Sequence, residues 1–470
     1  MPYNIRIVST YPPRRCGIGT FTRDLATAME NLTSEVGYIR IAAIDKKNGP
    51  YGIPVDLTIN QYDPQSWADT TKHIIKRASE SSNPTVVILQ HEYGLDPDAN
   101  GNDGRGTNYV DMAKTLKENG MTTLVYLHTV LDEPDEHQKK TLLNLANSSD
   151  GLIVTTESAI DILESEVYGI EHSKLKHIDH GIRMQHPSQF DRLEIKRDLG
   201  LENYFLISTL GLLSPGKGIQ YSIRAYGKFL SESCSESQRK KIVYMISGQS
   251  HPEFVKYDSG RPYREYVALL EDSLEQANVK WCRTKDLHTI NYDDYDVIFL
   301  EQFLDDNTLV RFYSASNIIV LPYLNMQQIS SGILADTVGA GRVAIATKFR
   351  YALELIHSNK KSQPGLIIGK FARGILVDPQ EPSVNQIASA IDYLVFNKGK
   401  RIMMEKQAHQ RGYQMRWDNS AWALLQYIDF VRDQQHIITG RGITFEREKD
   451  SSLMLPKKRK IPTWITLEHS

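Results

Sequence analysis

Three loops of the sequence combine glycine with cationic or hydroxyl side chains, and each lies between an apolar run and an amphipathic run. The first, at residues 9–20, places Arg14 and Arg15 shortly before Gly17 and Gly19. Glycine lets the N–H groups at the start of a helix approach a phosphate, and the positive helix end favours an anion. The loop lacks the third glycine of a dinucleotide fingerprint and the Gly-Lys-Ser/Thr of a P-loop. It indicates anion binding of another kind, with a plain tight turn as the alternative.

The second loop, at residues 210–219, has the sequence Leu-Gly-Leu-Leu-Ser-Pro-Gly-Lys-Gly-Ile. A lysine in a glycine-rich turn between a strand and a helix is well suited to neutralise a diphosphate. Lys217 is therefore a candidate for that role, and a lysine that caps a solvated turn is the alternative. Because one such loop opens each half of the chain, we expect an anion to bind in the cleft between the halves.

The third loop lies within residues 321–347, where an apolar stretch is followed by a polar loop and a run of small residues. Ser330, Ser331 and Gly332 stand at the expected helix start, where amides can donate to phosphate or sugar oxygens. Asp336 follows Gln328 by eight positions, about two turns if both are helical. We expect this pair to contact two parts of one extended ligand, and a solvated helix face is the alternative for Asp336.

The hydrophobic pattern predicts the elements that position these loops. Short runs rich in Val, Ile and Leu alternate with helical patterns such as 108–120 and 136–148, which is typical of buried parallel strands covered by helices. The expected strands are residues 4–10, 36–44, 85–92, 122–129 and 150–156, and then 204–211, 241–248, 296–303, 317–324 and 342–348.

This pattern predicts an α/β protein with two doubly wound, Rossmann-like domains that face a cleft, where such folds bind ligands. The expected domains are residues 1–185 and 186–412, with a linker near 182–192 that begins at His180 and Gly181 and has a hinge role. Apolar residues at helical spacing predict a crossing helix within 413–435 that braces both domains. The apolar positions that indicate it are Trp422, Leu424, Leu425, Ile428, Phe430 and Val431, and residues 436–470 look irregular.

Composition limits the classes of function. The chain has 470 residues, with 55 Lys and Arg against 57 Asp and Glu, so it lacks the basic excess of a nucleic-acid binder. No apolar run reaches the ~18–20 residues that span a bilayer, and the start shows no signal-peptide pattern. Three scattered cysteines imply neither a disulfide framework nor a zinc site. We therefore expect a cytoplasmic protein without a transmembrane segment or a nucleic-acid partner.

Taken together, the motifs resemble the retaining glycosyltransferases of family four (group 1), which have the two-domain arrangement called GT-B. The resemblance covers residues 4 to about 435 and rests on the order and spacing of short motifs. Its markers are YPPRRCGIGTFTRDL, QHEYG, LHTVLDEP, GLLSPGKGI, SGQSHPEF and QISSGILADTVGAG. The last is similar to a bacterial subgroup whose donor loop has Gln-Ile-Ser/Thr-Ser-Gly instead of Glu-Gly-Phe-Gly.

The resemblance implies roles for individual residues. It implies that Gly17 and Gly19 face the donor diphosphate and that His128, which alone would be a core or loop histidine, contacts the transferred sugar. It implies that Lys217 binds the diphosphate in a loop where Gly211 and Gly218 also match the family.

The family's two glutamates, which contact sugar and ribose hydroxyls, fall on Gln328 and Asp336. The main chain of a late loop, here Phe303 and Leu304, would hold the nucleobase. His91 and Glu92, at the end of an expected strand, are candidates for acceptor binding, with catalysis or a structural role as alternatives.

Two positions depart from the family pattern. Leu212 replaces an arginine that binds the diphosphate, which removes a contact of ~1.5–3 kcal/mol, and Arg14 and Arg15 are the cations that can compensate. Gln328 keeps an amide where the family has a carboxylate. Two Asp-x-Asp strings, at 96–98 and 294–296, resemble the metal pair of glycosyltransferases with another fold, but such strings are common by chance. We expect no metal and no cofactor.

The resulting hypothesis is a metal-independent, retaining hexosyltransferase that uses a nucleotide diphosphate sugar as donor. The donor is of the GDP-mannose or UDP-glucose type, and the acceptor is a saccharide or another hydroxyl compound. No protein nucleophile is evident, and the resemblance implies transfer on one face, with the leaving phosphate oxygen taking the acceptor's proton. Two alternatives stay open: a nucleotide-sugar-binding protein with weak turnover, favoured by Leu212 and Gln328, and a GT-B glycoside phosphorylase.

Overall fold

The computed structural model describes residues 2–32, 34–46, 49–96, 106–182, 192–250, 252–356, 368 and 371–439. The chain up to Val431 forms one compact unit. The predicted boundary at 185/186 and most of the predicted tail fall outside the described residues. No helix in the described part of the chain is both long and apolar enough to cross a membrane.

The first half of the chain forms a seven-stranded parallel sheet in the order β3-β2-β1-β4-β5-β6-β7. Its strands are β1 Tyr3–Ser9, β2 Val36–Asp45, β3 Val55–Asn60, β4 Thr85–His91, β5 Thr122–Leu127, β6 Gly151–Val154 and β7 Leu175–His177. Its helices are α1 Gly17–Glu30, α2 Pro64–Ser79, α3 Thr107–Glu118, α4 Glu136–Ser148 and α5 Glu157–Glu164, with short 3-10 turns at Tyr93–Leu95 and His172–Lys174.

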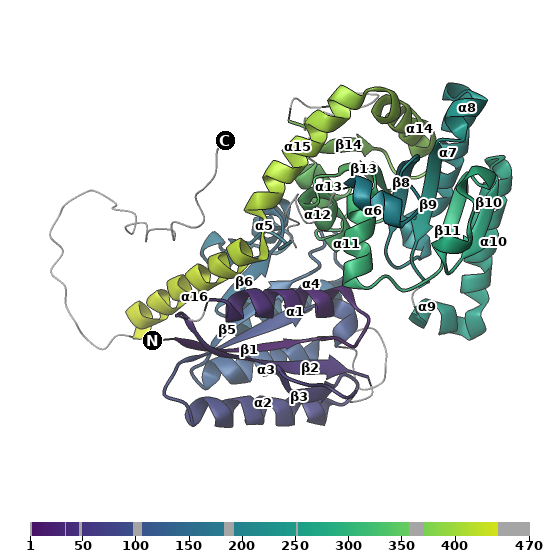
Figure 1. Cartoon of the computed structure of the whole chain (residues 1–470). Coiled ribbons are helices and arrows are strands. Elements are labelled where there is room, and N and C mark those ends of the chain that lie inside the picture. The colour runs from purple at the N-terminus through teal and green to yellow at the C-terminus, as the bar shows by residue number, and fades with distance from the viewer. Residues whose placement is uncertain are drawn as a thin grey trace, which may run out of the picture. The chain divides into compact units, whose positions relative to one another are not determined.

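The second half forms another seven-stranded parallel sheet, in the order β10-β11-β9-β8-β12-β13-β14. Its strands are β8 Phe205–Leu210, β9 Ile242–Ser247, β10 Trp281–Thr284, β11 Val297–Leu300, β12 Ile318–Leu321, β13 Val343–Thr347 and β14 Gly374–Val377. Its helices are α6 Arg192–Asp198, α7 Ile219–Ser233, α8 Glu236–Arg239, α9 Pro252–Lys256, α10 Arg261–Gln276, α11 Asp306–Ala315, α12 Gly332–Gly339, α13 Arg350–Leu355, α14 Glu381–Phe396 and α15 Lys398–Gln414, and α16 spans Trp417–Thr439. The α/β architecture with two Rossmann-like sheets is thus confirmed (Figure 1).

Successive side chains of a strand point to opposite faces of a sheet, and an apolar cluster covers each face of both sheets. In β4, Val86 and Ile88 enter the apolar cluster on one face, while Val87 and Leu89 enter the cluster on the other. All ten expected strands are present. The strands that the pattern missed are β3, β7, β10 and β14, which are the edge strands of the two sheets. They are three to six residues long and have a neighbouring strand on one side only.

The last two helices divide between the halves. Met404 and Ala408 of α15 join the apolar clusters of the second sheet. α16 instead lies beside α1 and β1 of the first sheet (Figure 1). It buries Trp417, Ala421, Leu424, Leu425, Tyr427, Ile428 and Val431 in the cluster that contains Ile5 and Ile7 of β1. The chain therefore crosses back to the first sheet between α15 and α16, while the predicted bracing of both domains by this helix stays a prediction.

Two details of α16 differ from the prediction. Phe430, expected on the buried face, is 46% exposed, because Tyr427, Ile428 and Val431 occupy the face toward β1. The helix also continues to Thr439, beyond the predicted end at residue 435.

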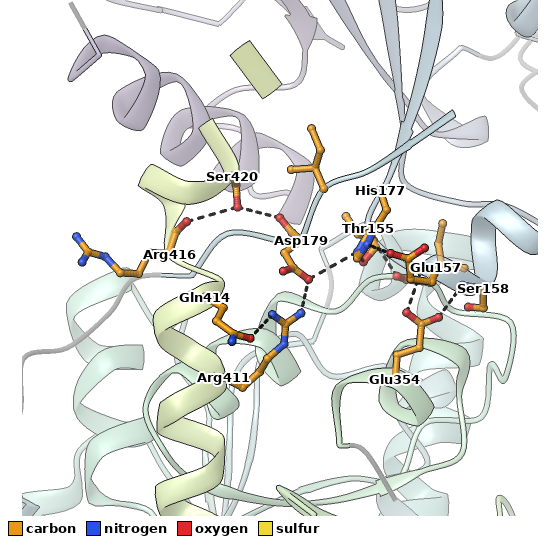
Figure 2. Close-up of polar contacts among 12 residues, drawn as sticks. Thr155, Glu157, Ser158, His177, Asp179, Glu354, Arg411, Gln414, Arg416 and Ser420 are labelled. Atoms are coloured by element: carbon orange, nitrogen blue, oxygen red, sulfur yellow. Dashed lines mark hydrogen bonds and ion pairs between the residues drawn. The ribbon is translucent and has the colours of Figure 1, made fainter. Parts of the chain in front are cut away.

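Polar contacts join the two halves. The carboxylate of Glu354 in α13 accepts hydrogen bonds from the backbone N–H groups of Glu157 and Ser158 at 2.9 and 2.8 Å (Figure 2). A second-half side chain therefore caps the start of α5, a first-half helix, where amides lack intrahelical partners. Thr155 adds a hydrogen bond from its Oγ1 to the carbonyl of Ile329 at 2.8 Å.

Candidate active site

A pocket of about 540 Å³ is lined by residues from both halves of the chain. The loop after β1 and the start of α1 contribute from the first half. The loops after β8, β9 and β11 contribute from the second half, together with α11 and the start of α12. The loops that follow the strands lie at carboxyl ends of parallel sheets, where ligands of doubly wound folds bind. Of the residues selected from sequence, the pocket contains Arg15, Gly17, Gly211, Lys217, Phe303, Leu304, Gly332 and Asp336.

The start of α1 opens into this pocket. Its N-cap residue, Cys16, makes no side-chain capping bond, and the first turn carries no acidic residue. A Cβ added to Gly17 would meet no atom within 4 Å, so the space beside this residue is open. The amides of the first turn lack intrahelical partners and are available to a ligand. Gly19, in contrast, is buried against the backbone of Tyr11 and allows close packing.

The two arginines of the first loop have different surroundings. Arg14 donates to the carbonyl of Ile44 at 3.1 Å and to Oε1 of Gln61 at 2.8 Å, so its side chain ties the loop to the rim of the first sheet. The Arg15 guanidinium lies 4.5 Å from the ring centroid of Phe303, which comes from the second half. No carboxylate pairs with Arg15 in the described part of the chain. Arg15 is therefore the arginine of this loop whose hydrogen bonds remain available to a ligand.

The second half supplies Lys217, which ends a short 3-10 turn at Pro215–Lys217. Its Nζ lies 3.8 Å from the ring centroid of Tyr323, and among the described residues no carboxylate pairs with it. Gly218 has φ +63°, and a Cβ there would lie 2.0 Å from the carbonyl oxygen of Pro322. Gly218 is thus required by the turn that aims Lys217, and it does not line the pocket.

The start of α12 forms the opposite wall. Ser331 caps the helix, with its Oγ accepting from the amide of Leu334 at 3.3 Å, while Gly332 lines the pocket. Helix geometry leaves the amides of Gly332 and Ile333 for a ligand. The side chain of Gln328 donates to the carbonyl of Ser330 at 2.6 Å, which closes a local turn. The structure does not bring Gln328, Ser330 or Ser331 into the pocket lining, so their direct roles stay predictions.

Two carboxyl groups of the pocket, those of Asp24 and Asp336, have raised pKa values, whereas hydrogen bonds from Thr308 lower the pKa of Asp305. Burial, with the charges of Asp24 and Asp306, raises the pKa of Asp336 to about 8. Burial likewise raises the pKa of Asp24 to about 6, although the nearby Arg23 acts in the other direction. Arg23 pairs with Asp306 of α11 at 2.7 Å and so links the two halves at the edge of the pocket. Asp24 and Asp336 therefore stay protonated to a higher pH than an ordinary aspartic acid does.

The histidines selected from sequence, His91 and His128, are buried side chains that are not among the residues lining the pocket. Nε2 of His128 lies 2.5 Å from Oε1 of Gln90, and its ring is stacked on Tyr126. Burial lowers the pKa of His128 to about 3. His91 is fully buried, and neither ring nitrogen has a hydrogen-bond partner among the described residues; burial lowers its pKa to about 4. Neither histidine lines the pocket.

The carboxylate of Glu92, next to His91, is also engaged within the protein. It accepts hydrogen bonds from Oγ1 of Thr129 at 2.7 Å and from the amide of Tyr93 at 3.0 Å. Burial raises the pKa of Glu92. The acceptor-binding roles predicted for His91 and Glu92 therefore have no support from the pocket geometry and stay predictions.

The structure places a histidine in the pocket that the sequence analysis assigned to the hinge. His180 lines the pocket, and its ring makes edge contacts with Phe21 at 5.1 Å and a tilted contact with Trp417 at 5.7 Å. Its Nδ1 lies 2.7 Å from the carbonyl oxygen of Gly181, and burial lowers its pKa to about 4. A carbonyl only accepts, so Nδ1 carries the proton and Nε2 of the neutral ring is a free acceptor.

Residues around His180 fix its backbone. Figure 2 shows the Asp179 carboxylate between Arg411 of α15, at 2.5 Å, and His177 of β7, at 3.6 Å. Oγ of Ser420 in α16 donates to the carbonyl of Asp179 at 2.9 Å. A Cβ on Gly181 would lie 2.1 Å from the Trp417 indole, so only glycine allows this packing. The crossing from α15 to α16 thus holds the segment that carries His180.

Several pocket residues that the sequence analysis missed follow helical spacing from the residues that begin each helix. Gly17, Thr20 and Asp24 share one face of α1, and Asp306, Val310 and Tyr313 share one face of α11. Extending each helix from its loop by this spacing would have found them. For His180 and Trp417 no such signal exists, since they meet only through the crossing of the chain.

The Asp-x-Asp strings have structural roles where they are described. Asp296 accepts from the Arg239 guanidinium at 2.6 and 2.8 Å and from the amide of Lys280 at 2.8 Å, at the start of β11. Asp96 accepts from the amide of Tyr109 at 2.9 Å and from Asn108 at 2.7 Å. Pro97 and Asp98 lie outside the described residues. Within the part of the chain that the structure covers, no three His, Cys, Asp or Glu side chains converge to hold a metal ion.

Solved structures share this fold over nearly the whole chain. A crystal structure of Anabaena HepE in complex with UDP has a TM-score of 0.62 and 14% sequence identity, covering 91% of this chain and 99% of that one. An α,α-trehalose-phosphate synthase (UDP-forming) from Burkholderia xenovorans, in complex with glucose-6-phosphate, has a TM-score of 0.62 and 12% identity, covering 91% and 100%. A glycosyltransferase from Rickettsia africae has a TM-score of 0.62 and 13% identity, covering 94% and 100%.

No protein-family model matches the chain, and no curated protein matches it. The fold is therefore established by the two sheets and by these structures, and it is the GT-B arrangement of two Rossmann-like domains.

Proposed function

We propose that the protein is a glycosyltransferase that moves a hexosyl group from a nucleoside diphosphate sugar to a hydroxyl group of a sugar or sugar phosphate. One observation carries this proposal: the start of α1, the start of α12, Arg15 and Lys217 meet in one pocket from opposite halves of the chain. Two helix ends and two cations are suited to binding a diphosphate and to stabilising the charge that develops as it leaves.

The carboxyl group of Asp336 fits this role because its pKa is raised. A diphosphate would be repelled by ionised carboxylates, but Asp336, with a pKa of about 8, is largely protonated at neutral pH. A protonated carboxyl offers one donor and one acceptor, which suits two neighbouring hydroxyl groups. We assign Asp336 to the ribose of the donor, and the Phe303–Leu304 segment to its base.

A uridine donor of the UDP-glucose type is the donor we propose. The support is the likeness in fold to HepE, whose structure contains UDP, and to a UDP-forming trehalose-phosphate synthase. The glucose-6-phosphate bound to the synthase supports a sugar or sugar phosphate as acceptor. The mannose donor considered from sequence has no corresponding support.

We further assign a retaining, metal-independent mechanism. The family resemblance supports retention. In this mechanism the protein supplies charge and position: Lys217 and the helix amides stabilise the leaving diphosphate, whose oxygen takes the proton of the acceptor hydroxyl. Contact between the halves excludes water and limits hydrolysis of the donor.

A panel of labelled donors tests the proposal. The full-length protein is incubated with UDP-glucose, UDP-galactose, UDP-N-acetylglucosamine or GDP-mannose, each with glucose, glucose-6-phosphate or no acceptor. We expect release of UDP from UDP-glucose that rises when an acceptor is present, and an α-linked product in the NMR spectrum. If no donor is turned over and no nucleoside diphosphate binds, the proposal is wrong.

A second test uses Arg15 together with Leu212, the residue that stands where the resembling family has an arginine. If Arg15 replaces the missing family arginine, Arg15→Gln should weaken UDP binding by about tenfold to a hundredfold, the value of a charge-assisted hydrogen bond. Leu212→Arg in the Arg15→Gln background should restore most of this affinity, because Leu212 lines the same pocket. A double variant as weak as Arg15→Gln alone would show that Arg15 does not compensate for the substitution.

A nucleotide-sugar-binding protein with weak turnover is the second candidate. It is favoured by Leu212 in the pocket wall and by Gln328, whose amide is engaged with Ser330. The two candidates differ in the donor panel: the binding protein would bind UDP-glucose and release UDP at the same slow rate with and without an acceptor.

A further inference from the structure

The ring of His177, at the end of β7, lies between hydrogen-bond acceptors on both sides (Figure 2). Its Nδ1 lies 2.6 Å from Oε1 of Glu157, while its Nε2 lies 3.2 Å from the carbonyl oxygen of Thr155 and 3.6 Å from Oδ1 of Asp179. Carboxylate and carbonyl oxygens only accept, and a neutral imidazole donates from one nitrogen. Both hydrogen bonds are therefore made only when the ring carries two protons and a positive charge.

The charged groups packed around this ring come from both halves of the chain. Three are carboxylates and two are guanidinium groups, so a second proton on the ring brings the positive charges to three. They are Glu157 of α5, Asp179 after β7, Glu354 of α13, Arg373 before β14 and Arg411 of α15. The protonated ring thus balances the charges where the two halves meet.

Thr155 links the ring to the second half of the chain. Its Oγ1 donates to the carbonyl of Ile329 at 2.8 Å, and the residue is 1% exposed. Ile329 is equally buried, in the apolar cluster of the first half that also contains Val154 and Ala159. Gly332, three residues later, begins α12 and lines the pocket. The loop that leads into α12 is thus held from the first half.

We propose that His177 and Thr155 are positioning residues: the doubly protonated ring of His177 holds the backbone of Thr155, and Oγ1 of Thr155 holds the loop that places the start of α12 in the pocket. The effect of this positioning on nucleotide binding rests on the proposed function, whereas the hydrogen bonds themselves do not.

The charge of the ring sets the direction of the effect. When the ring loses one proton, the other stays on Nδ1, which lies nearer to a carboxylate, and the lone pair of Nε2 then faces the carbonyl of Thr155. That hydrogen bond is lost, and the loop before α12 is held less firmly. Histidine is the side chain that commonly changes its charge between about pH 5 and 8. We therefore expect the loop to be held best at the acidic end of this range.

Hydrogen exchange tests the positioning without any ligand. Exchange is followed by mass spectrometry near pH 6 and near pH 8, with correction for the intrinsic rate, in peptides that cover residues 155–160 and 326–336. The first contains the amides of Glu157 and Ser158, which donate to Glu354, and the second contains the amide of Leu334 in the first turn of α12. In the wild type, protection of both segments should fall as the pH rises. In His177→Gln it should be low at both pH values.

His172→Gln is the matched control for the histidine. His172 pairs with Glu164 of the same helix, α5, also at 2.6 Å, but its side chain is 79% exposed and this contact lies within the first half. This variant should keep the pH dependence of the wild type.

Calorimetry with UDP tests the consequence for the pocket. The affinity of the wild type is divided by that of His177→Gln at each pH, so that the titration of UDP and of other pocket groups cancels. We expect a ratio of about threefold to tenfold near pH 6, the effect of one hydrogen bond, and a ratio near one at pH 8. Thr155→Val should lose a similar factor near pH 6, and Thr155→Ser, which keeps the hydroxyl, should restore it. His177→Gln combined with Thr155→Val should equal Thr155→Val alone, because both remove the same link.

The results separate this inference from the proposed function. Equal protection of both segments in the wild type and His177→Gln at each pH would overturn the positioning role, whether or not UDP binds. Thr155→Ser as weak as Thr155→Val would overturn it as well, because the hydroxyl would then not hold the loop. If protection changes as expected but no nucleoside diphosphate binds, the positioning of the loop stands and the proposed function is wrong.

Discussion

Asp336→Asn removes one titrating group from the pocket and keeps the shape of the side chain. In the folded protein, burial and the charges of Asp24 and Asp306 raise the pKa of Asp336 from 3.8 to about 8. In the unfolded chain this carboxyl returns to its ordinary pKa. Over the interval between the two values the folded state therefore binds one proton that the unfolded state does not.

This proton sets the sign of the pH dependence. A raised pKa in the folded state means that the contribution of Asp336 to stability is complete below the unfolded pKa. It is lost as the pH rises through the folded pKa. One proton corresponds to a limit of about 1.4 kcal/mol per pH unit. From pH 5.5 to 7.5 the wild type should thus lose about 2.5 kcal/mol more unfolding free energy than Asp336→Asn.

Two measurements check this expectation. Urea unfolding of both proteins at the two pH values gives the difference in unfolding free energy. Difference titration of the native proteins counts the proton directly and should show one group with a midpoint near the pKa of about 8. Asp69→Asn, on an α2 residue whose side chain is 61% exposed, is the matched control and should not change the slope. Equal pH slopes for the wild type and Asp336→Asn, with a difference titration near pH 4, would refute the reasoning.

Three further expectations follow from the structure. Lys217→Met should lower turnover by about tenfold to a hundredfold without loss of folding, because Lys217 contacts mainly the Tyr323 ring within the protein. Lys228→Met, in α7, is the control, and unchanged turnover in Lys217→Met would exclude a role of Lys217 in stabilising the leaving diphosphate. Activity should persist after exhaustive chelation, since no metal-ligand cluster forms among the described residues; loss with EDTA and recovery with manganese would contradict this. Leu424→Ala should lower the unfolding free energy by about 2–5 kcal/mol, because Leu424 of α16 is fully buried. Phe430→Ala should change the unfolding free energy little, and equal effects of the two variants would argue against the packing of α16 on the first sheet.

The sequence was most informative where a residue's position depends on its neighbours in the chain. The strand-to-helix loops at Gly17, Lys217 and Gly332 were found from local spacing, since a loop at the end of a parallel strand has its position dictated by the sheet. The four edge strands were missed because short strands with fewer sheet partners need less apolar sequence. In both cases, the success of the prediction depends on how strongly the local sequence reflects the position of the element in the sheet.

Side chains placed by distant contacts could not be predicted in this way. His180 reaches the pocket only because Ser420 and Trp417, more than two hundred residues later, hold its backbone. His128 matches a family pattern, but its ring contacts Gln90 and Phe21 and it is not among the residues that line the pocket, so its role stays a prediction. In both cases the deciding contacts join segments that no local pattern relates.

The return of α16 to the first sheet has a consequence for synthesis of the chain on the ribosome. The last strand of that sheet ends at His177, but its apolar cluster is completed by residues up to Val431. Roughly 250 further residues must be made first, which takes on the order of 10–50 s at about 5–20 residues per second. During this time β1 and α1 have emerged without the helix that covers them. The half of the molecule that is made first is therefore the last to be finished, and the apolar face of β1 and α1 lacks its covering helix until then.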